Sequence, residues 1–237
     1  MIYISKIRNN RPLVDRTSYP YNIPSIINLE ELTLRNEVTF IIGENGSGKS
    51  TLVEAIAINA GFNPEGGSRN FNFSTQDSHS ALFEDIQLIR TAYRNKDGFF
   101  LRAESFYNVA TAIDNYVVHG AYGGSLHERS HGESFLALLH HRLGGNGLYI
   151  FDEPESALSI ISQLNMLTRV RQLVEKKSQF IIATHSPILL AYPNADIYQV
   201  SAEGIRPVAY EDTEQYILTK YFMNNRAKML SELGLDF

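Results

Sequence analysis

The stretch "FIIGENGSGKSTLVEAIA", Phe40 to Ala57, restricts the fold of this chain more than any other segment. A run of apolar, strand-like residues leads into a loop with three glycines, and a helix-like pattern follows Lys49 and Ser50. Gly43 to Ser50 fits the spacing G-x-x-x-x-G-K-[ST], in which glycines let backbone N–H groups converge on phosphate oxygens. The spacing therefore predicts a phosphate-binding loop between a strand and a helix whose dipole favours anions.

The bulk composition excludes several classes of protein. A chain of 237 residues suffices for one sizeable α/β domain or two small ones. The formal charge of −5 argues against binding nucleic acid with the whole surface, which requires a positive field. Cysteine is absent, so we expect neither disulfides nor thiolate metal sites. No signal peptide or bilayer-spanning apolar run is present, so we expect a cytoplasmic protein without direct membrane insertion.

Short apolar segments alternate with helical patterns along the chain. The expected strands are "MIYISKI", two strands within "IINLEELTLRNEVTFII", "GFFLRAESF", "GLYIFDEPE", "SQFIIATHSP" and a hairpin in "DIYQVSAEGIRPVAY". The expected helices cover Ser50–Gly61, Ala81–Tyr93, "GESFLALLHHRLGG", Ile160–Lys177 and Asp212–Leu233. This order predicts an α/β fold with a mostly parallel sheet covered by helices on both faces.

Acidic residues follow the buried strand in "LYIFDEPE", Leu148 to Glu155. In open α/β sheets, ligands bind at the carboxyl ends of the strands. We expect Asp152 to hold Mg²⁺ together with the hydroxyl of Ser50, and Glu153 to orient and deprotonate an attacking water. Lys49 is expected to reach the β and γ phosphates of a nucleotide.

Two further motifs have both a structural and a functional interpretation. His185 follows the strand in "QFIIATHSP", where an imidazole can contact a γ-phosphate, although a single histidine is more often structural. In "RSHGES", Ser130 and Glu133 have the spacing of a capping box, which alone explains a helix start. With Gly132 beside them, the same residues also describe an anion site at a helix N-terminus.

Taken in order, the four motifs resemble those of the ABC-type ATPases. "SHGES" resembles the signature "LSGGQ/E" with His131 in place of a glycine. "DEPESALS" resembles the Walker B motif and D-loop, with Ser159 where an aspartate is common, and "THSP" resembles the H-switch. The match runs from about Ile2 to Val208.

The resemblance implies a fold and a set of ligands. It implies a single ABC-type P-loop domain over residues 1–237, with an N-terminal antiparallel β portion and a short helical signature subregion over residues 81–145. It also implies ATP and Mg²⁺ as cofactors. The implied nucleotide-binding loop comprises Gly43, Glu44, Asn45, Gly46, Ser47, Gly48, Lys49, Ser50 and Thr51.

The resemblance further implies that two copies form a head-to-tail homodimer when ATP binds. Each nucleotide would then contact the loop of one copy and Ser130, Gly132 and Glu133 of the other. Lys49, Glu153 and His185 would be the catalytic residues, and ATP binding and hydrolysis would close and open the pair.

Two positions of the family pattern are open in this sequence. The residue that senses Mg²⁺ between the phosphate loop and the signature is Glu104, favoured by its place at a strand end, or Gln76, favoured by its side chain. An aromatic residue that stacks on adenine is expected upstream of the loop, where Tyr19 and Tyr21 lie.

Three roles fit an ABC-type ATPase of this length. The first is a stand-alone switch related to the SMC and recombination-repair branch, with DNA repair or defence as its expected setting. It is favoured by "GENGSGKSTLVEAIA", by Glu133 and by the short segment between Glu104 and Ser130. The second is the ATP-binding subunit of a membrane transporter, and the third is an interaction module with little turnover. A protein partner from the same operon fits the first two, and nucleic acid could bind through local arginines such as Arg90, Arg94 and Arg102.

Overall fold

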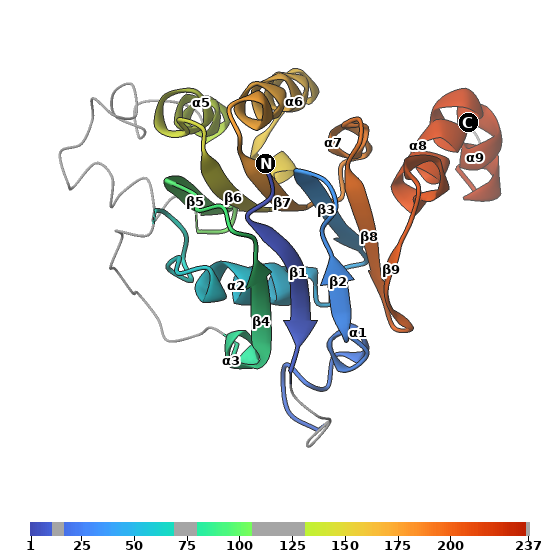
Figure 1. Ribbon diagram of the computed structural model, residues 1–237. Coiled ribbons are helices and arrows are strands. Elements are labelled where there is room, and N and C mark those ends of the chain that lie inside the picture. Colours follow the sequence, from blue (N-terminus) through green and yellow to red (C-terminus); the bar gives the residue numbers. More distant parts are fainter. Residues whose placement is uncertain (11–16, 69–79, 106–130, 236–237) are drawn as a thin grey trace.

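The computed structural model describes residues 1–10, 17–68, 80–105 and 131–235. Its central element is a six-stranded sheet in the order β5-β6-β7-β3-β8-β9, in which only the edge strand β9 is antiparallel (Figure 1). The strands are β3 (Val38–Gly43), β5 (Asp97–Arg102), β6 (Gly147–Asp152), β7 (Gln179–Ala183), β8 (Asp196–Ser201) and β9 (Gly204–Pro207). Every residue of β3, β6 and β7 is buried, which explains their continuous apolar sequences. The predicted mostly parallel α/β sheet is confirmed.

A second, antiparallel sheet is formed by β2 (Glu31–Thr33), β1 (Ile4–Asn9) and β4 (Ile86–Arg90). The predicted helix over Ala81–Tyr93 is wrong, because only α3 (Leu82–Asp85) is helical there. Ile86 and Leu88 are buried while Gln87 between them is exposed, and the segment pairs with β1. The expected N-terminal antiparallel β portion is thus present and includes a strand from later in the chain.

Helices cover both faces of the six-stranded sheet (Figure 1). On one face lie α5 (His131–Ala137), the π-helix η2 (Leu138–Arg142), α6 (Ile160–Glu175) and α7 (Pro187–Leu190). On the other face, α2 (Lys49–Asn59) packs between the two sheets and is buried along most of its length. The short helix α1 (Pro24–Ile27) lies beside the start of α2. The helices predicted after the phosphate loop, around Phe135 and over Ile160–Lys177 are confirmed.

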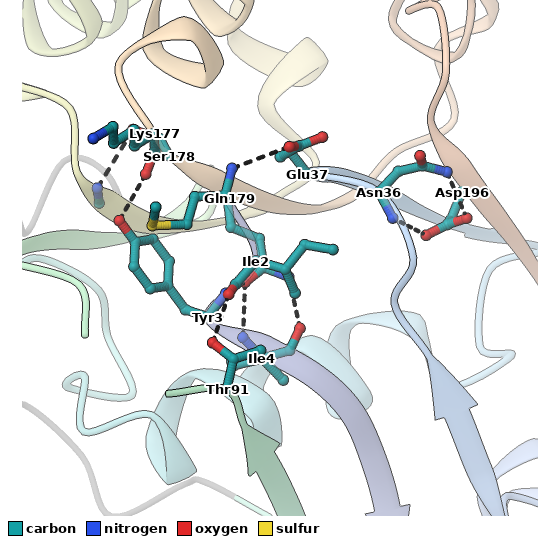
Figure 2. Close-up of polar contacts among 12 residues, drawn as sticks. Ile2, Tyr3, Ile4, Asn36, Glu37, Thr91, Lys177, Ser178, Gln179 and Asp196 are labelled. Carbon is teal, nitrogen blue, oxygen red and sulfur yellow. Dashed lines mark hydrogen bonds and ion pairs between the residues drawn. The ribbon is translucent and has the colours of Figure 1, made fainter. Parts of the chain in front are cut away.

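The buried amide of Gln179 joins the two sheets (Figure 2). Its Oε1 accepts hydrogen bonds from the N–H groups of Tyr3 and Ile4 at 2.8 and 2.9 Å, and its Nε2 donates to the Ile4 carbonyl at 2.8 Å. The Tyr3 hydroxyl donates to the Lys177 carbonyl at 2.6 Å. These contacts fix the start of β1 at the start of β7, so the antiparallel sheet lies over α2.

The C-terminal part is a hairpin followed by helices. The predicted β8–β9 hairpin is confirmed, but the single helix expected over Asp212–Leu233 is two helices, α8 (Glu214–Asn224) and α9 (Arg226–Glu232). They separate at Asn225, whose backbone is not helical, with φ −131° and ψ 38°. Two short 3₁₀ segments, η3 (Pro154–Ala157) and η4 (Tyr210–Asp212), complete the described elements. Among the described residues, no helix is long and apolar enough to cross a membrane.

Candidate nucleotide-binding site

The loop between β3 and α2 has the backbone that a phosphate-binding loop requires. Gly48 precedes α2 in the left-handed region with φ 100°, and a Cβ atom there would lie 2.9 Å from both Ile23 and Ser25. At Gly43 a Cβ atom would lie 2.4 Å from the carbonyl oxygen of Val200. The loop is thus restricted to glycine at both positions and is held tightly against its neighbours.

Lys49 lies inside this loop. It is only 4% exposed, and its ammonium donates a hydrogen bond to the carbonyl of Glu44 at 2.9 Å. Burial lowers the pKa of the Lys49 ammonium, while the negative charges of Glu153 and Asp152 oppose this shift. The cation is therefore held at the loop, facing the acidic end of β6.

The pair predicted to hold a metal is formed by Ser50 and Asp152. The Ser50 hydroxyl donates to Asp152 Oδ1 at 3.1 Å, joining the first turn of α2 to the end of β6. Burial raises the pKa of Asp152 to about 6, and the nearby Arg102 guanidinium and the Ser50 hydrogen bond oppose this shift. A hydroxyl and a carboxylate are oxygen donors of the kind that Mg²⁺ prefers. In the described part of the chain, no three acidic, histidine or cysteine side chains are arranged so that they could hold a metal ion together. Mg²⁺ at nucleotide sites needs only one or two protein ligands.

Glu153 and His185 meet beside this pair. His185 Nε2 lies 3.5 Å from Glu153 Oε1, and both side chains are about a third exposed. The backbone of Glu153 is left-handed, with φ 50° and ψ 51°, although its N–H still donates to the Ala183 carbonyl of β7 at 3.0 Å. A non-glycine residue in this conformation is uncommon and is found preferentially at functional sites. The ends of β6 and β7 therefore bring together the two residues predicted for hydrolysis.

A cavity of about 550 Å³ is lined by Lys49, Ser50 and Glu153. Its walls include the loop residues Asn45, Gly46 and Gly48, the helix start at Lys49, Ser50 and Thr51, and the two acidic side chains Glu104 and Glu153. Its dimensions and its position at the carboxyl ends of β3 and β6 fit a small phosphorylated ligand.

Glu104 lies at the edge of this cavity, and its side chain is 89% exposed. Arg102 Nη2 lies 3.7 Å from Glu104 Oε2, and the role of Glu104 in sensing a metal stays a prediction. The alternative residue, Gln76, lies outside the described residues.

Arg102 and Glu54 belong to the site and were not predicted. β5 pairs with β6 so that Arg102 is the partner of Asp152, and Arg102 Nε lies 3.8 Å from Asp152 Oδ2. Arg102 Nη1 donates to Glu54 Oε2 at 2.5 Å, and Glu54 is buried on α2. Arg102, named above as a candidate for nucleic-acid contact, is thus engaged inside the site.

Gly132 and Glu133 lie in the first turn of α5, and Ser130 lies outside the described residues. Glu133 is exposed, and Gly132 packs so closely that a Cβ atom would lie 2.9 Å from the Ala157 carbonyl. Neither residue lines the cavity at the phosphate loop. The structure thus does not bring these two residues to the loop of their own chain.

The two tyrosines considered for adenine differ in position. Tyr19 lines the cavity, is 60% exposed, and its hydroxyl lies 3.2 Å from Thr51 Oγ1. Tyr21 is partly buried and donates a hydrogen bond to Asp85. Only Tyr19 has its ring beside the loop.

Fold and site together define a P-loop nucleotide-binding domain. Comparison with known proteins refines this class. A family model described as an AAA domain matches residues 21–120. The probable ATP-dependent transporter ycf16 of Antithamnion sp. is 26% identical over 83% of this chain and 90% of its own.

Solved structures share the fold. cbiO1 of Clostridium perfringens, part of the ABC transporter complex cbiONQ, superposes with a TM-score of 0.52 at 17% identity, over 98% of this chain and 100% of its own. The SMC head domain from Thermotoga maritima has a TM-score of 0.50 at 16% identity, over 88% of this chain and 100% of its own. This chain therefore has the P-loop fold of the ATP-binding subunits of ABC transporters and of the SMC head domain.

Proposed function

We propose that this protein binds ATP with Mg²⁺ and hydrolyses it, using the binding and loss of ATP to close and open a homodimer. The observation that carries this proposal is that Lys49, Ser50 and Glu153 line one cavity, where Ser50 donates a hydrogen bond to Asp152. A cation, a metal-binding pair and a carboxylate are the groups that phosphoryl transfer to water requires.

Each of these groups has a distinct role in the proposed reaction. The loop N–H groups and Lys49 bind the β and γ phosphates. Ser50 and Asp152 would hold Mg²⁺, which neutralises charge on the phosphates when bound. Glu153 accepts a proton from the attacking water, and His185, 3.5 Å away, orients that water and the γ-phosphate.

The proposed dimer explains the position of the signature residues. Gly132 and Glu133 do not line the cavity of their own chain, so a role in nucleotide binding requires a second copy. In a head-to-tail pair, Ser130, Gly132 and Glu133 of one copy face the nucleotide of the other. A single domain over residues 1–237 is part of this proposal.

Phosphate release with ATP, compared between the native protein and Glu153→Gln, tests the proposal. The variant keeps the size of the side chain but loses the proton acceptor, so it should bind ATP normally and release phosphate at least about a hundredfold more slowly. Glu203→Gln, an exposed residue in the β8–β9 turn, is the matched control. Equal and very slow phosphate release by the native protein and Glu153→Gln would instead favour an interaction module with little turnover.

The cellular role that we favour is a cytoplasmic switch acting without a membrane subunit. The SMC-like sequence around the phosphate loop supports it. The second candidate is the ATP-binding subunit of a transporter, which the names of similar proteins favour. Recovery of the active protein from the cytosolic fraction, and ATPase rates with DNA, RNA and a protein encoded in the same operon, distinguish the two roles.

A further inference from the structure

The turn that carries His185 is held by the segment that follows Glu153. The backbone N–H of His185 donates to Glu155 Oε1 at 2.5 Å, which is short for an N–H···O hydrogen bond. Glu155 lies in η3, two residues after Glu153, whereas His185 follows β7, thirty residues further along the chain. A carboxylate that accepts from an N–H group makes a stronger hydrogen bond than a neutral acceptor.

A second contact holds the same turn from α6. The buried hydroxyl of Ser186 donates to Gln163 Oε1 at 2.5 Å, and Gln163 Nε2 donates to the Leu158 carbonyl at 3.1 Å. Ser186 also begins α7 by accepting hydrogen bonds from Ile188 and Leu189. The turn is therefore held on both sides of His185 by side chains from residues 155–163.

The geometry assigns Glu155 and Gln163 as positioning residues for His185. Because Glu155 holds the His185 backbone and lies two residues after Glu153, it fixes the distance between the imidazole and the Glu153 carboxylate. Among the described residues, the second oxygen of Glu155 is buried and has no hydrogen-bond partner. Glu155 thus accepts a hydrogen bond from the His185 N–H, which lies in the turn after β7.

A competing explanation is that Glu155 acts through its charge. Its negative charge is one of three that oppose the lowering of the Lys49 pKa, although Glu153 and Asp152 contribute more. A positioning role needs only an oxygen acceptor at the Glu155 side chain, whereas a charge role needs the carboxylate. Glu155→Gln keeps the acceptor and removes the charge, so it separates the two explanations.

This inference rests on the proposed function, and the experiment uses Glu155→Ala, Glu155→Gln and the control Glu175→Ala, whose side chain is exposed on α6. For Glu155→Ala we expect kcat to fall at least about tenfold while the Kd for ATP changes less than about twofold, because the phosphate loop is untouched. Glu155→Gln should keep kcat within about threefold of the native protein, since its amide oxygen still accepts the His185 N–H.

A second measurement is independent of turnover. In the nucleotide-free protein labelled with ¹⁵N, the short hydrogen bond should shift the His185 amide proton downfield. Glu155→Ala should remove most of this shift, and Glu155→Gln should keep part of it. Gln163→Met, of similar volume, tests the other side of the turn and should also lower kcat with little change in the Kd for ATP.

Three outcomes would overturn the assignment. The first is a hydrolysing native protein whose kcat and His185 amide shift are both unchanged in Glu155→Ala. The second is a Glu155→Gln variant as slow as Glu155→Ala, which would show that the charge of Glu155, and not its hydrogen bond to His185, determines kcat. The third is a loss of ATP affinity as large as the loss of kcat. A native protein that does not hydrolyse ATP would instead contradict the proposed function, and the amide shift would still test the contact.

Discussion

The hydroxyl of Ser50 donates a hydrogen bond to Asp152 Oδ1 over 3.1 Å, across 102 positions of the chain. Ser50 is in the first turn of α2, and Asp152 is the last residue of β6. The contact joins the phosphate loop to the acidic strand end, and both groups are oxygen ligands of the type found around Mg²⁺. It is the structural basis for the proposed metal site.

Ser50→Ala should remove the part of ATP affinity that depends on Mg²⁺. The alanine cannot ligate the metal, whereas the loop N–H groups and Lys49 still bind the phosphates. We expect the Kd for ATP with Mg²⁺ to rise about tenfold and the Kd in EDTA to change little. Titration of a fluorescent ATP analogue under both conditions measures this, with Thr168→Ala on α6 as the control. An equal loss with and without Mg²⁺ would count against a metal role.

Asp152→Asn should stabilise the nucleotide-free protein at high pH. Burial raises the Asp152 pKa from 3.8 to about 6, so the native protein loses stability as pH rises through this interval and the buried carboxyl ionises. The asparagine cannot ionise, so its free energy of unfolding should exceed that of the native protein by up to about 3 kcal/mol at pH 8.

The pH dependence makes this prediction specific. At pH 4.5 the difference in the free energy of unfolding should narrow to about 1 kcal/mol, because most of the native Asp152 is then protonated in the folded state. Urea unfolding of both proteins between pH 4.5 and 8 measures the difference. Asp212→Asn, an exposed position, should show no such trend. A constant difference across the range would show that the Asp152 pKa is not raised.

Tyr19→Ala should weaken binding of ATP without weakening binding of tripolyphosphate. The Tyr19 ring is exposed at the cavity and can stack on a base, whereas tripolyphosphate offers only phosphates. We expect the Kd for ATP to rise about fivefold to tenfold. Competition by both compounds against a fluorescent analogue measures this, and Tyr93→Ala, exposed elsewhere, is the control. Equal losses for ATP and tripolyphosphate would exclude stacking and indicate a disturbed loop.

The sequence predicts those parts of the site that lie at the ends of buried strands. β3, β6 and β7 are buried and mostly apolar, and parallel strands end at one edge, so Lys49, Asp152 and His185 were expected to meet. Arg102 could not be predicted in this way, because its place beside Asp152 depends on the register between β5 and β6. Glu54 gave a weak signal, since it lies four residues after Ser50 and so one turn further along the same helix.

The segment after Ala81, wrongly predicted to be a long helix, shows a second limit of prediction from the sequence. "LFED" begins as a helix, and the five residues of β4 are too few for a period of two to be distinguished from a helical pattern. Pairing with the distant strand β1, in which Asn9 is the partner of Ile86 and Ile4 of Arg90, decides the conformation. A non-local contact of this kind leaves no pattern in the local sequence.

Mixing two inactive variants should restore activity if the nucleotide lies between two copies. Lys49→Ala disables the phosphate loop of its own chain, and Ser130→Arg places a bulky charge where the other copy's nucleotide is expected. In a mixed dimer, one site contains an intact loop from one copy and an intact signature from the other. Random pairing of equal amounts then leaves about a quarter of all sites intact, so about a quarter of native activity should return.

The control for this prediction is the formation of the mixed dimer itself. Two affinity tags, one on each variant, followed by sequential purification with ATP bound, isolate the mixed dimer, in which half of the sites should be active. Ser130 is preferred to Gly132 for the substitution, because any side chain at Gly132 would collide with the Ala157 carbonyl of its own chain. If the purified mixed dimer is as inactive as either variant alone, the nucleotide is not shared between copies, and the positions of Gly132 and Glu133 away from the cavity need a different explanation.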